Sequence, residues 1–312
     1  MKENYVVAIG VACIDEYYET DHWIPEGEKC NIRWRENRVG GMIPNAACVL
    51  AGLGEKTYLV TALNSSSVSE VIKKDLENCK LDLSYMITDD SLSDPKCIIV
   101  STPAERSIFV VDTSNIRYKV DKALYDLLIN ARCIYTSIME FHRLQNWETL
   151  ARELTEAGVA LIFDVETSTF DRWDDPLFSY ADLLFFNEEG WKKFKNGRSD
   201  AETAQGLLEG NVKTFAVTLG EKGCYCRNRE SEIRLPGNKV NVIDPTGAGD
   251  TFNCSFTACW LRGESLEYAA EYANAAAAHA VTVVGARAGI ATKEETEQRM
   301  REFRKEKEAL EK

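Results

Sequence analysis

The chain has 312 residues, of which 45% are hydrophobic and 28% are charged, proportions typical of an ordinary soluble globular protein. This length allows one large α/β domain or two smaller ones. Because no linker or low-complexity segment interrupts the sequence, we expect residues 1–312 to form a single domain. The formal net charge of −13 argues against nucleic acid as a partner, since phosphate backbones require a basic surface. It leaves a small anionic substrate open, because a local patch can oppose the overall charge.

The N-terminal apolar run spans only about seven residues, too few for a signal peptide or a membrane span. We therefore expect no membrane partner. Ten cysteines without an export signal suggest the reducing cytoplasm. There is no C-x-x-C pair, and Cys224-x-Cys226 fits one face of a strand better than a metal site. The three histidines are far apart in sequence, so a histidine-rich metal site is not expected.

The first half of the chain opens with a near-continuous apolar run at residues 5–13, which predicts a strand buried on both faces. Asp15 follows that strand, where α/β sheets place ligand-binding groups. A turn or capping aspartate explains Asp15 equally well. Short strand-like pieces continue to Arg38, and a Gly-rich turn at 39–45 then leads into a helix predicted over 46–53.

Residues 96–111 contain two strand-like runs joined by a turn at 103–106, a hairpin pattern that predicts an antiparallel insert. Elsewhere strands and helices alternate, which favours a parallel sheet with helices on both faces. We therefore predict a three-layer α/β fold, mainly parallel, with a small antiparallel accessory. Its other expected strands are 57–63, 133–138, 160–165, 183–186 and 214–219, and its other expected helices are 68–79, 147–157, 251–261, 266–283 and a charged terminal helix within 293–312.

The sequence DPTGAGDTF at residues 244–252 follows apolar positions and precedes a long Ala-rich segment. This order predicts a tight turn that opens a helix, whose free N–H groups and positive dipole end suit an anion. Gly247 and Gly249 would let the backbone approach that anion closely. Asp250 fits two roles, either capping the helix or accepting a proton from a hydroxyl that attacks a phosphate. The spacing alone does not choose between these roles.

Taken together, the two Gly-rich loops and their order resemble the ribokinase (PfkB-type) carbohydrate kinase family over nearly the whole chain. The most specific match is the segment at 244–252, and the second is GGMIPNAA at 40–47. The segment VTLGEKG at 217–223 is similar as well. Further similarities are Asp15, Glu140 and the run NAAAA that begins at Asn274.

The resemblance implies a doubly wound sheet with a β lid built from about 16–37 and 94–113. It implies an ATP-dependent kinase that uses Mg²⁺, with Asp250 as the general base. The N–H groups of Gly247, Ala248 and Gly249 would form the anion hole for the transferred phosphoryl group. The implied sugar contacts are Asp15, Gly41, Asn45 and Glu140; the implied nucleotide contacts are Asn187, Thr218, Gly220, Gly223 and Asn274. K⁺ would lie around Asp244, Thr246 and the turn at 285–287.

The chain departs from the family pattern at two places that bear on the site. Ile43 and Pro44 stand where the family has small residues, which would reshape the floor of the sugar pocket. The family's Asn-x-x-Glu motif, linked to Mg²⁺ and phosphate, ends here in Gly190. Glu188 or Glu189 would then have to act through water.

The expected substrate is a hydroxyl of a sugar or sugar-like polyol, with a nucleoside kinase as the alternative enzyme. A purine would need an apolar clamp, for which Trp34, Phe109 and Phe141 are candidates, although core or lid packing explains each equally simply. Arg106 on the lid could face an anionic substrate or only solvent. A non-catalytic sugar-binding sensor is the other alternative, and the resemblance also suggests a homodimer formed through the lid.

Overall fold

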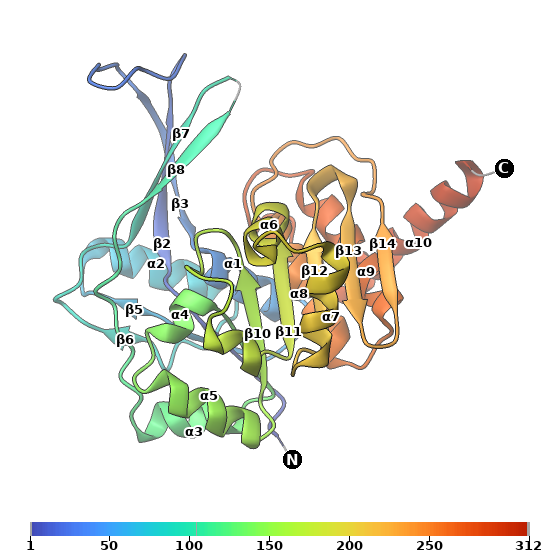
Figure 1. The fold of residues 1–312 in the computed structure, drawn as a ribbon. Helices are drawn as coiled ribbons and strands as arrows, with labels where there is room; N and C mark the ends of the chain where they lie inside the picture. Colours follow the sequence, from blue (N-terminus) through green and yellow to red (C-terminus); the bar gives the residue numbers. More distant parts are fainter. Residues whose placement is uncertain (1, 104, 311–312) are drawn as a thin grey trace.

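The structure, a computed structural model, describes residues 2–103 and 105–310. Its main sheet has eight strands in the order β14-β13-β12-β11-β10-β9-β1-β4 (Figure 1). The strands from β12 to β4 run parallel, whereas β13 and β14 form an antiparallel edge. The bounds are β1 Val6–Ile9, β4 Thr57–Val60, β9 Cys133–Ser137, β10 Ala160–Val165, β11 Leu183–Asn187, β12 Thr214–Thr218, β13 Cys224–Asn228 and β14 Glu232–Leu235.

Helices cover both faces of this sheet and form two separate cores (Figure 1). Successive side chains of β1 point to opposite faces of the sheet, so Val6 and Ala8 pack in one core while Val7 and Ile9 pack in the other. The helices of the first core are α1 Met42–Gly52, α2 Ser67–Asn78, α8 Ala248–Leu261, α9 Leu266–Ala280 and α10 Lys293–Leu310. Those of the second are α3 Lys122–Asn130, α4 Ile138–His142, α5 Trp147–Glu156, α6 Glu188–Lys195 and α7 Asp200–Glu209.

A second sheet of four strands projects from this body (Figure 1). Its order is β3-β2-β7-β8, with antiparallel outer pairs and a parallel central pair, β2 with β7. The bounds are β2 Cys13–Glu19, β3 Arg33–Gly40, β7 Lys96–Ser101 and β8 Arg106–Val110. The predicted three-layer, mainly parallel fold with a small antiparallel accessory is therefore confirmed; the hairpin pattern did not indicate the parallel central pair. We call this second sheet the lid.

Two short strands and two 3₁₀ turns complete the described part of the fold. The strands β5 Ala62–Leu63 and β6 Ile87–Thr88 form a two-stranded parallel sheet, and β11 is preceded by the 3₁₀ turn η1 Pro176–Tyr180. A second 3₁₀ turn, η2 Gly220–Lys222, connects β12 to β13. Within the described residues, no helix combines the length and apolar character that crossing a bilayer requires.

The predicted strand at 5–13 is wrong in one respect, because the structure divides it. β1 ends at Ile9, and the chain leaves the main sheet before β2 begins at Cys13. The N–H of Ala12 donates to Thr61 Oγ1 (3.1 Å), whereas the N–H of Ile14 already donates to Pro95 O (3.0 Å) beside the lid. Asp15 therefore lies inside a lid strand.

The two helices that follow the Gly-rich loops begin earlier than predicted. α1 starts at Met42 rather than Ala46, and α8 starts at Ala248 rather than Thr251. Pro44 lies in the first turn of α1, where a missing N–H leaves no intrahelical hydrogen bond unmade. Both helices thus begin directly at their glycines, which brings their N-termini to the loops.

Phe256 in α8 tests the packing that holds this helix on the sheet. Its ring is fully buried and meets Phe185 of β11 edge to face, with ring centroids 5.6 Å apart. We expect Phe256→Ala to lower the free energy of unfolding by about 3–5 kcal/mol, because it leaves a cavity in the core. Urea denaturation followed by circular dichroism measures this. Val242→Ala, at a residue 58% exposed, is the control and should change stability by less than about 0.5 kcal/mol; equal losses would contradict the assignment.

Candidate active site

The predicted anion site lies at the N-terminus of α8. Gly247 caps the helix with a φ of 80°, a left-handed conformation that disfavours other residues. A side chain there would also collide with Ala286. Ala248 N–H donates to Pro245 O (3.3 Å), while in the described part of the chain the N–H groups of Gly247 and Gly249 have no hydrogen-bond acceptor. Two of the three predicted amides are therefore free.

Asp250 lies in the first turn of this helix and is a partly exposed residue. Among the described residues it makes no ion pair; its hydrogen-bond partner is the Asn45 side chain. Burial raises the pKa of Asp250 well above its usual range, and the charges of Asp164 and Glu166 raise it further. A carboxylate with a raised pKa accepts a proton more readily than an ordinary aspartate.

Asp164 and Glu166, at the end of β10, were not predicted as site residues. Asp164 is 3% exposed and accepts hydrogen bonds from Tyr135 Oη and Asn253 Nδ2, both at 2.9 Å. Burial raises the pKa of Asp164 to about 7, and Glu166 adds to this shift. The signal in the sequence was two acids at the carboxyl end of a predicted parallel strand, the edge at which such sheets bind ligands.

Gly190, where the family motif has glutamate, lies directly against β10. A Cβ at this position would collide with Val165 O and approach Glu166 Cα to 3.3 Å, so this backbone leaves no room for a side chain. Glu188 and Glu189 are engaged by Lys222 (3.0 Å) and Lys192 (3.6 Å). The charge of Glu166 acts on Asp250, whereas both predicted substitutes pair with lysines.

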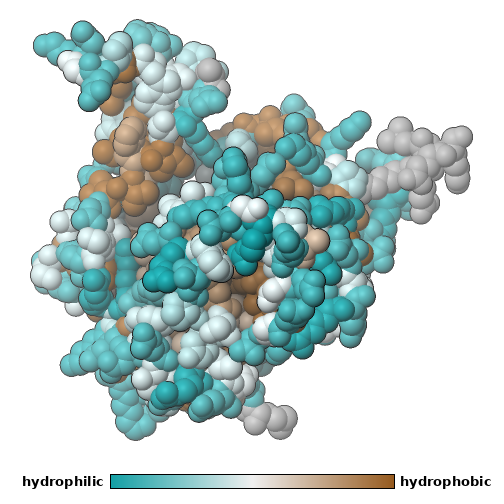
Figure 2. All heavy atoms as spheres, in the orientation of Figure 1, coloured by the Kyte–Doolittle hydropathy of each residue, from teal (hydrophilic) through white to brown (hydrophobic). Residues whose placement is uncertain are grey.

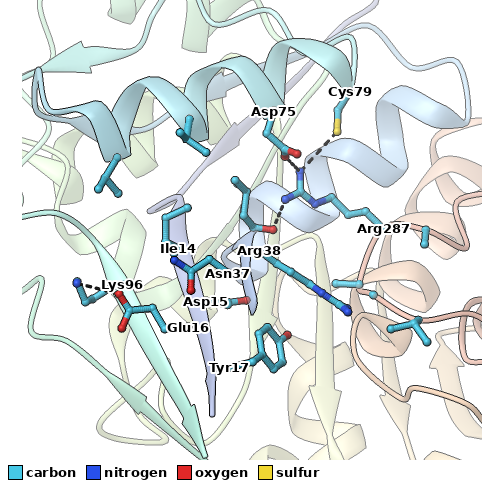
Figure 3. A pocket seen from close by; sticks show the side chains of 17 residues that line it. Ile14, Asp15, Glu16, Tyr17, Asn37, Arg38, Asp75, Cys79, Lys96 and Arg287 are labelled. Atoms are coloured by element: carbon cyan, nitrogen blue, oxygen red, sulfur yellow. Dashed lines mark hydrogen bonds and ion pairs between the residues drawn. The ribbon is translucent and has the colours of Figure 1, made fainter. Parts of the chain in front are cut away.

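Asp15 lines a pocket of about 570 Å³ between the lid, α2 and the turn at 284–288 (Figure 3). Burial raises the pKa of Asp15. Arg287 donates to Val39 O and to Asp75 Oδ2 (2.6 Å), and so ties the turn to β3 and α2. Arg38 also faces this pocket, with its guanidinium 5.3 Å from the ring centroid of Tyr17. The pocket thus combines carboxylate, guanidinium and apolar groups.

Three of the predicted sugar contacts are brought together around α1. Gly41 caps this helix, and Asn45 on its first turns is buried and bonded to Asp250. Asn45 Oδ1 has no hydrogen-bond partner in the described part of the chain. The Asp15 carboxyl lies against Gly40, the residue before that cap, so this contact is also next to the start of α1.

Glu140, the fourth predicted sugar contact, is held by other partners. Its carboxylate pairs with Arg143 Nη1 (3.2 Å) and accepts a hydrogen bond from Tyr118 Oη (3.2 Å). Burial raises the pKa of Glu140. Arg143 borders a separate pocket of about 360 Å³ beside α4, and no described contact joins Glu140 to Asp15 or Asn45.

The predicted nucleotide contacts lie mainly at the carboxyl ends of β11 and β12. Asn187 and Thr218 are register partners on these strands, and Gly220 and Gly223 flank the turn η2 that follows. Asn187 Oδ1 accepts the Gly190 N–H (2.7 Å), so this side chain also caps α6. Asn274 lies in α9, where its Nδ2 donates to Pro236 O (2.8 Å), and Pro236 in turn lies against Gly223.

The predicted K⁺ ligands Asp244 and Thr246 have other partners in this structure. Asp244 accepts N–H groups from Thr246 and Gly285, both at 2.9 Å, and Arg38 Nη1 lies 3.7 Å from its carboxylate. Arg106 Nη1 of the lid donates to Thr246 Oγ1 (2.7 Å). Two guanidinium groups therefore already supply positive charge here; the K⁺ site stays a prediction.

The comparisons with known proteins agree with this arrangement. The sequence profile of the pfkB family carbohydrate kinases matches residues 3–293. Ribokinase from Staphylococcus aureus (strain COL) is 25% identical, over 95% of this chain and 99% of its own. The ATP-dependent ribose-1-phosphate kinase of Halopiger xanaduensis is 28% identical, over 85% of this chain and 88% of its own.

The fold is likewise similar to a solved ribokinase. The structure of Arabidopsis thaliana ribokinase complexed with ribose and ATP superposes with a TM-score of 0.82, at 22% identity, over 95% of this chain and 98% of its own. At this identity the likeness shows the fold alone, whereas the profile match spans nearly the whole chain. The chain belongs to the pfkB family of carbohydrate kinases and is a phosphotransferase with the ribokinase fold.

Proposed function

We propose that this chain transfers the γ-phosphoryl group of ATP to a hydroxyl of a sugar or sugar-like small molecule, with Asp250 as general base. The observation that carries the proposal is the mouth of α8, where the Asp250 carboxyl lies beside free N–H groups. Phosphoryl transfer requires a proton acceptor for the attacking hydroxyl and neutralisation of charge on the moving group. This single helix end offers both.

In the proposed mechanism, the substrate hydroxyl lies against the Asp250 carboxylate, which takes its proton as the oxygen attacks. Asn45 orients that carboxylate through its hydrogen bond. The N–H groups of Gly247 and Gly249 stabilise the transferred phosphoryl group. Asp15 accepts a hydrogen bond from a further substrate hydroxyl.

Mg²⁺ bound to ATP would neutralise charge on the nucleotide phosphates. The donor set fits this ion, because Glu166 and Asp164 supply the hard oxygen ligands that Mg²⁺ prefers, directly or through water. In the described part of the chain neither carboxylate has an ion-pair partner of its own. We propose that Glu166 takes the place of the motif glutamate that Gly190 replaces, while Thr218 and the glycines around η2 border the nucleotide.

Of the three aromatic residues considered as a clamp for a nucleoside base, Phe141 is excluded by its position. Phe141 is fully buried in the second core, where it packs on Phe163 with centroids 5.7 Å apart, so it cannot clamp a base. Trp34 and Phe109 are exposed on the lid rather than lining the pocket around Asp15. A sensor needs no proton acceptor, and the geometry at Asp250 therefore supports the kinase.

Asp250→Asn tests the proposed base. We expect kcat to fall about 10²- to 10⁴-fold with little change in substrate affinity, because the amide cannot accept the hydroxyl proton. The measurement is a coupled assay of ADP release with ATP, Mg²⁺ and a panel of sugars, sugar phosphates and nucleosides. Asp126→Asn, the same change on the exposed face of α3, is the control. Near-full turnover by Asp250→Asn would reject the role of Asp250, and no turnover of any panel member by the wild type would reject the substrate class.

Glu166→Gln tests the charge coupling at the site. Asp250 must be ionised to act, so its raised pKa makes kcat/KM fall as the pH drops through that value. Removing the Glu166 charge removes one cause of the raised pKa, and the acidic limb of the profile should move to lower pH. A profile of kcat/KM against pH measures the shift. An unmoved limb, or one displaced to higher pH, would contradict the coupling.

We propose that the lid also forms a homodimer interface. Its edge strand β8 exposes Ile108, Phe109 and Val110, the last at 68%, and Trp34 is exposed on β3. Figure 2 shows hydrophobic surface on the projecting lid. An exposed apolar edge strand favours association with another strand. A dimer would cover this surface.

The double variant Ile108→Lys and Val110→Lys tests the dimer, because both side chains lie on the same face of β8. We expect the wild type at twice the 35.1 kDa chain mass by size-exclusion chromatography with light scattering, and the variant at the chain mass. Val242→Lys, which adds charge to an exposed valine off the lid, should leave the dimer intact. A monomeric wild type would refute the interface.

A further inference from the structure

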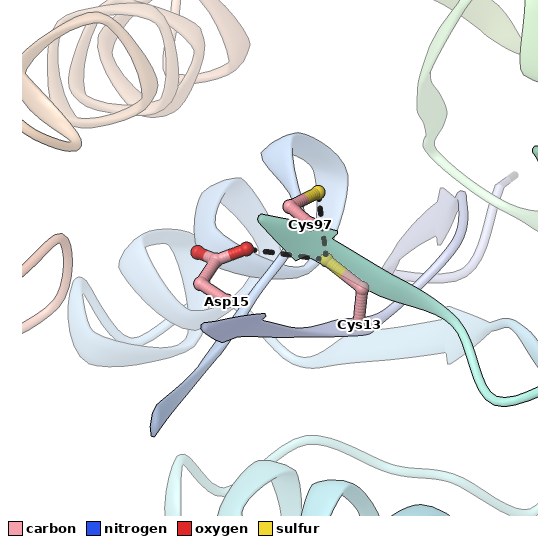
Figure 4. A group of neighbouring side chains, drawn as sticks. All are labelled: Cys13, Asp15 and Cys97. Atoms are coloured by element: carbon pink, nitrogen blue, oxygen red, sulfur yellow. Dashed lines mark hydrogen bonds between the residues drawn. The ribbon is translucent and has the colours of Figure 1, made fainter. Parts of the chain in front are cut away.

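Two thiols and a carboxylate share one face of the lid beside the pocket (Figure 4). Cys13 and Asp15 are two residues apart on β2 and so point to the same side, and Cys97 is the register partner of Asp15 on the parallel strand β7. Cys13 Sγ lies 3.7 Å from Cys97 Sγ and 3.5 Å from Asp15 Oδ1. The three potential ligand atoms all lie within 4.8 Å of one another.

The two distances from Cys13 Sγ match edges of a metal tetrahedron. With Zn–S near 2.3 Å and Zn–O near 2.0 Å, tetrahedral angles separate two sulfurs by about 3.8 Å and a sulfur from an oxygen by about 3.5 Å. A disulfide would require the sulfurs at about 2.05 Å. We propose that Cys13, Cys97 and Asp15 form a three-ligand site for Zn²⁺ or a similar borderline-soft dication, an assignment that the sequence analysis did not make.

The surroundings favour a dication with one coordination position open to solvent. Cys13 is buried, whereas Cys97 and Asp15 are partly exposed, so the site is closed on the core side and accessible from the other. Binding releases one proton from each thiol, and the two thiolates and the carboxylate then hold the divalent ion. Arg287 acts on Asp15 at longer range, but its guanidinium is engaged by Asp75 and Val39 O.

A second pair of thiols lacks these properties and provides the comparison. Cys48 of α1 and Cys79 after α2 are neighbours, but Arg287 Nη1 contacts both sulfurs, at 3.6 and 3.5 Å. A bound dication there would lie against the guanidinium charge. We expect a metal at the lid pair and none at this one.

Metal binding would regulate the kinase by competition, a consequence that rests on the proposed function. Asp15 is the proposed partner of a substrate hydroxyl, and its carboxylate cannot serve the ion and the sugar in the same geometry. Zn²⁺ should therefore act as an inhibitor that raises KM for the sugar, and a chelator should reverse the effect.

Metal binding can be measured directly, without sugar or ATP, so the test is independent of the proposed function. Reduced full-length protein is titrated with Co²⁺ in the absence of oxygen and with a non-thiol reductant. We expect one equivalent to bind, with the visible bands of tetrahedral Co²⁺ and a thiolate-to-cobalt band in the near ultraviolet, all displaced by Zn²⁺. Cys13→Ser and Cys97→Ser should each lose the thiolate band, while Cys48→Ser keeps it.

Circular dichroism and thermal melts establish that each variant is folded. Should Cys13→Ser be unfolded, Asp15→Asn replaces it and is expected to weaken cobalt binding at least tenfold, with the thiolate band retained. The absence of a thiolate band in the reduced wild type would overturn the proposal. Persistence of the thiolate band in folded Cys97→Ser, or loss of the band from Cys48→Ser, would also overturn the proposal.

Discussion

The site depends on a concentration of carboxyl groups at the positive end of one helix. Asp250 lies in the first turn of α8, and Asp164 and Glu166 act on it from β10. Burial, and then repulsion from these two charges, raises the pKa of Asp250, whereas the free N–H groups nearby attract negative charge. A helix end with free amides alone would bind an anion, and a carboxyl cluster alone would repel it. Together they provide an anion site with a proton acceptor beside it.

This arrangement requires segments that are far apart in the chain to meet. Arg287 ties the turn after α9 to β3 and α2, and Asp244 ties the Gly-rich loop at 244–249 to the same turn through the Gly285 N–H. Arg106 reaches from the lid to Thr246 in that loop. The lid is therefore in contact with the residues that would hold the phosphoryl group, and a substrate under it would be shielded from water.

Much of the fold follows from local patterns. The apolar runs at the parallel strands, the hairpin at 96–111 and the glycines at 247 and 249 each predict the element that the structure contains. The helices α3, α4, α6 and α7 were not predicted, because their short apolar stripes, such as Leu124 with Leu127 and Leu128, gain significance only against the sheet they cover. The break between β1 and β2 was missed because residues 5–13 are apolar throughout, although the chain changes sheets there.

For the site, the sequence by itself determined the residues whose role depends on neighbours along the chain: the Gly-rich turn, the helix it opens and Asp250 in its first turn. Tertiary structure alone decided what depends on distance. Glu166 lies beside Gly190, which has no room for a side chain, and Glu140 pairs with Arg143. Cys97 lies next to Cys13 and Asp15, although 84 positions of sequence separate the two thiols. The physical reason is that charge coupling and metal geometry act through space, whereas a sequence pattern reports only the order of residues.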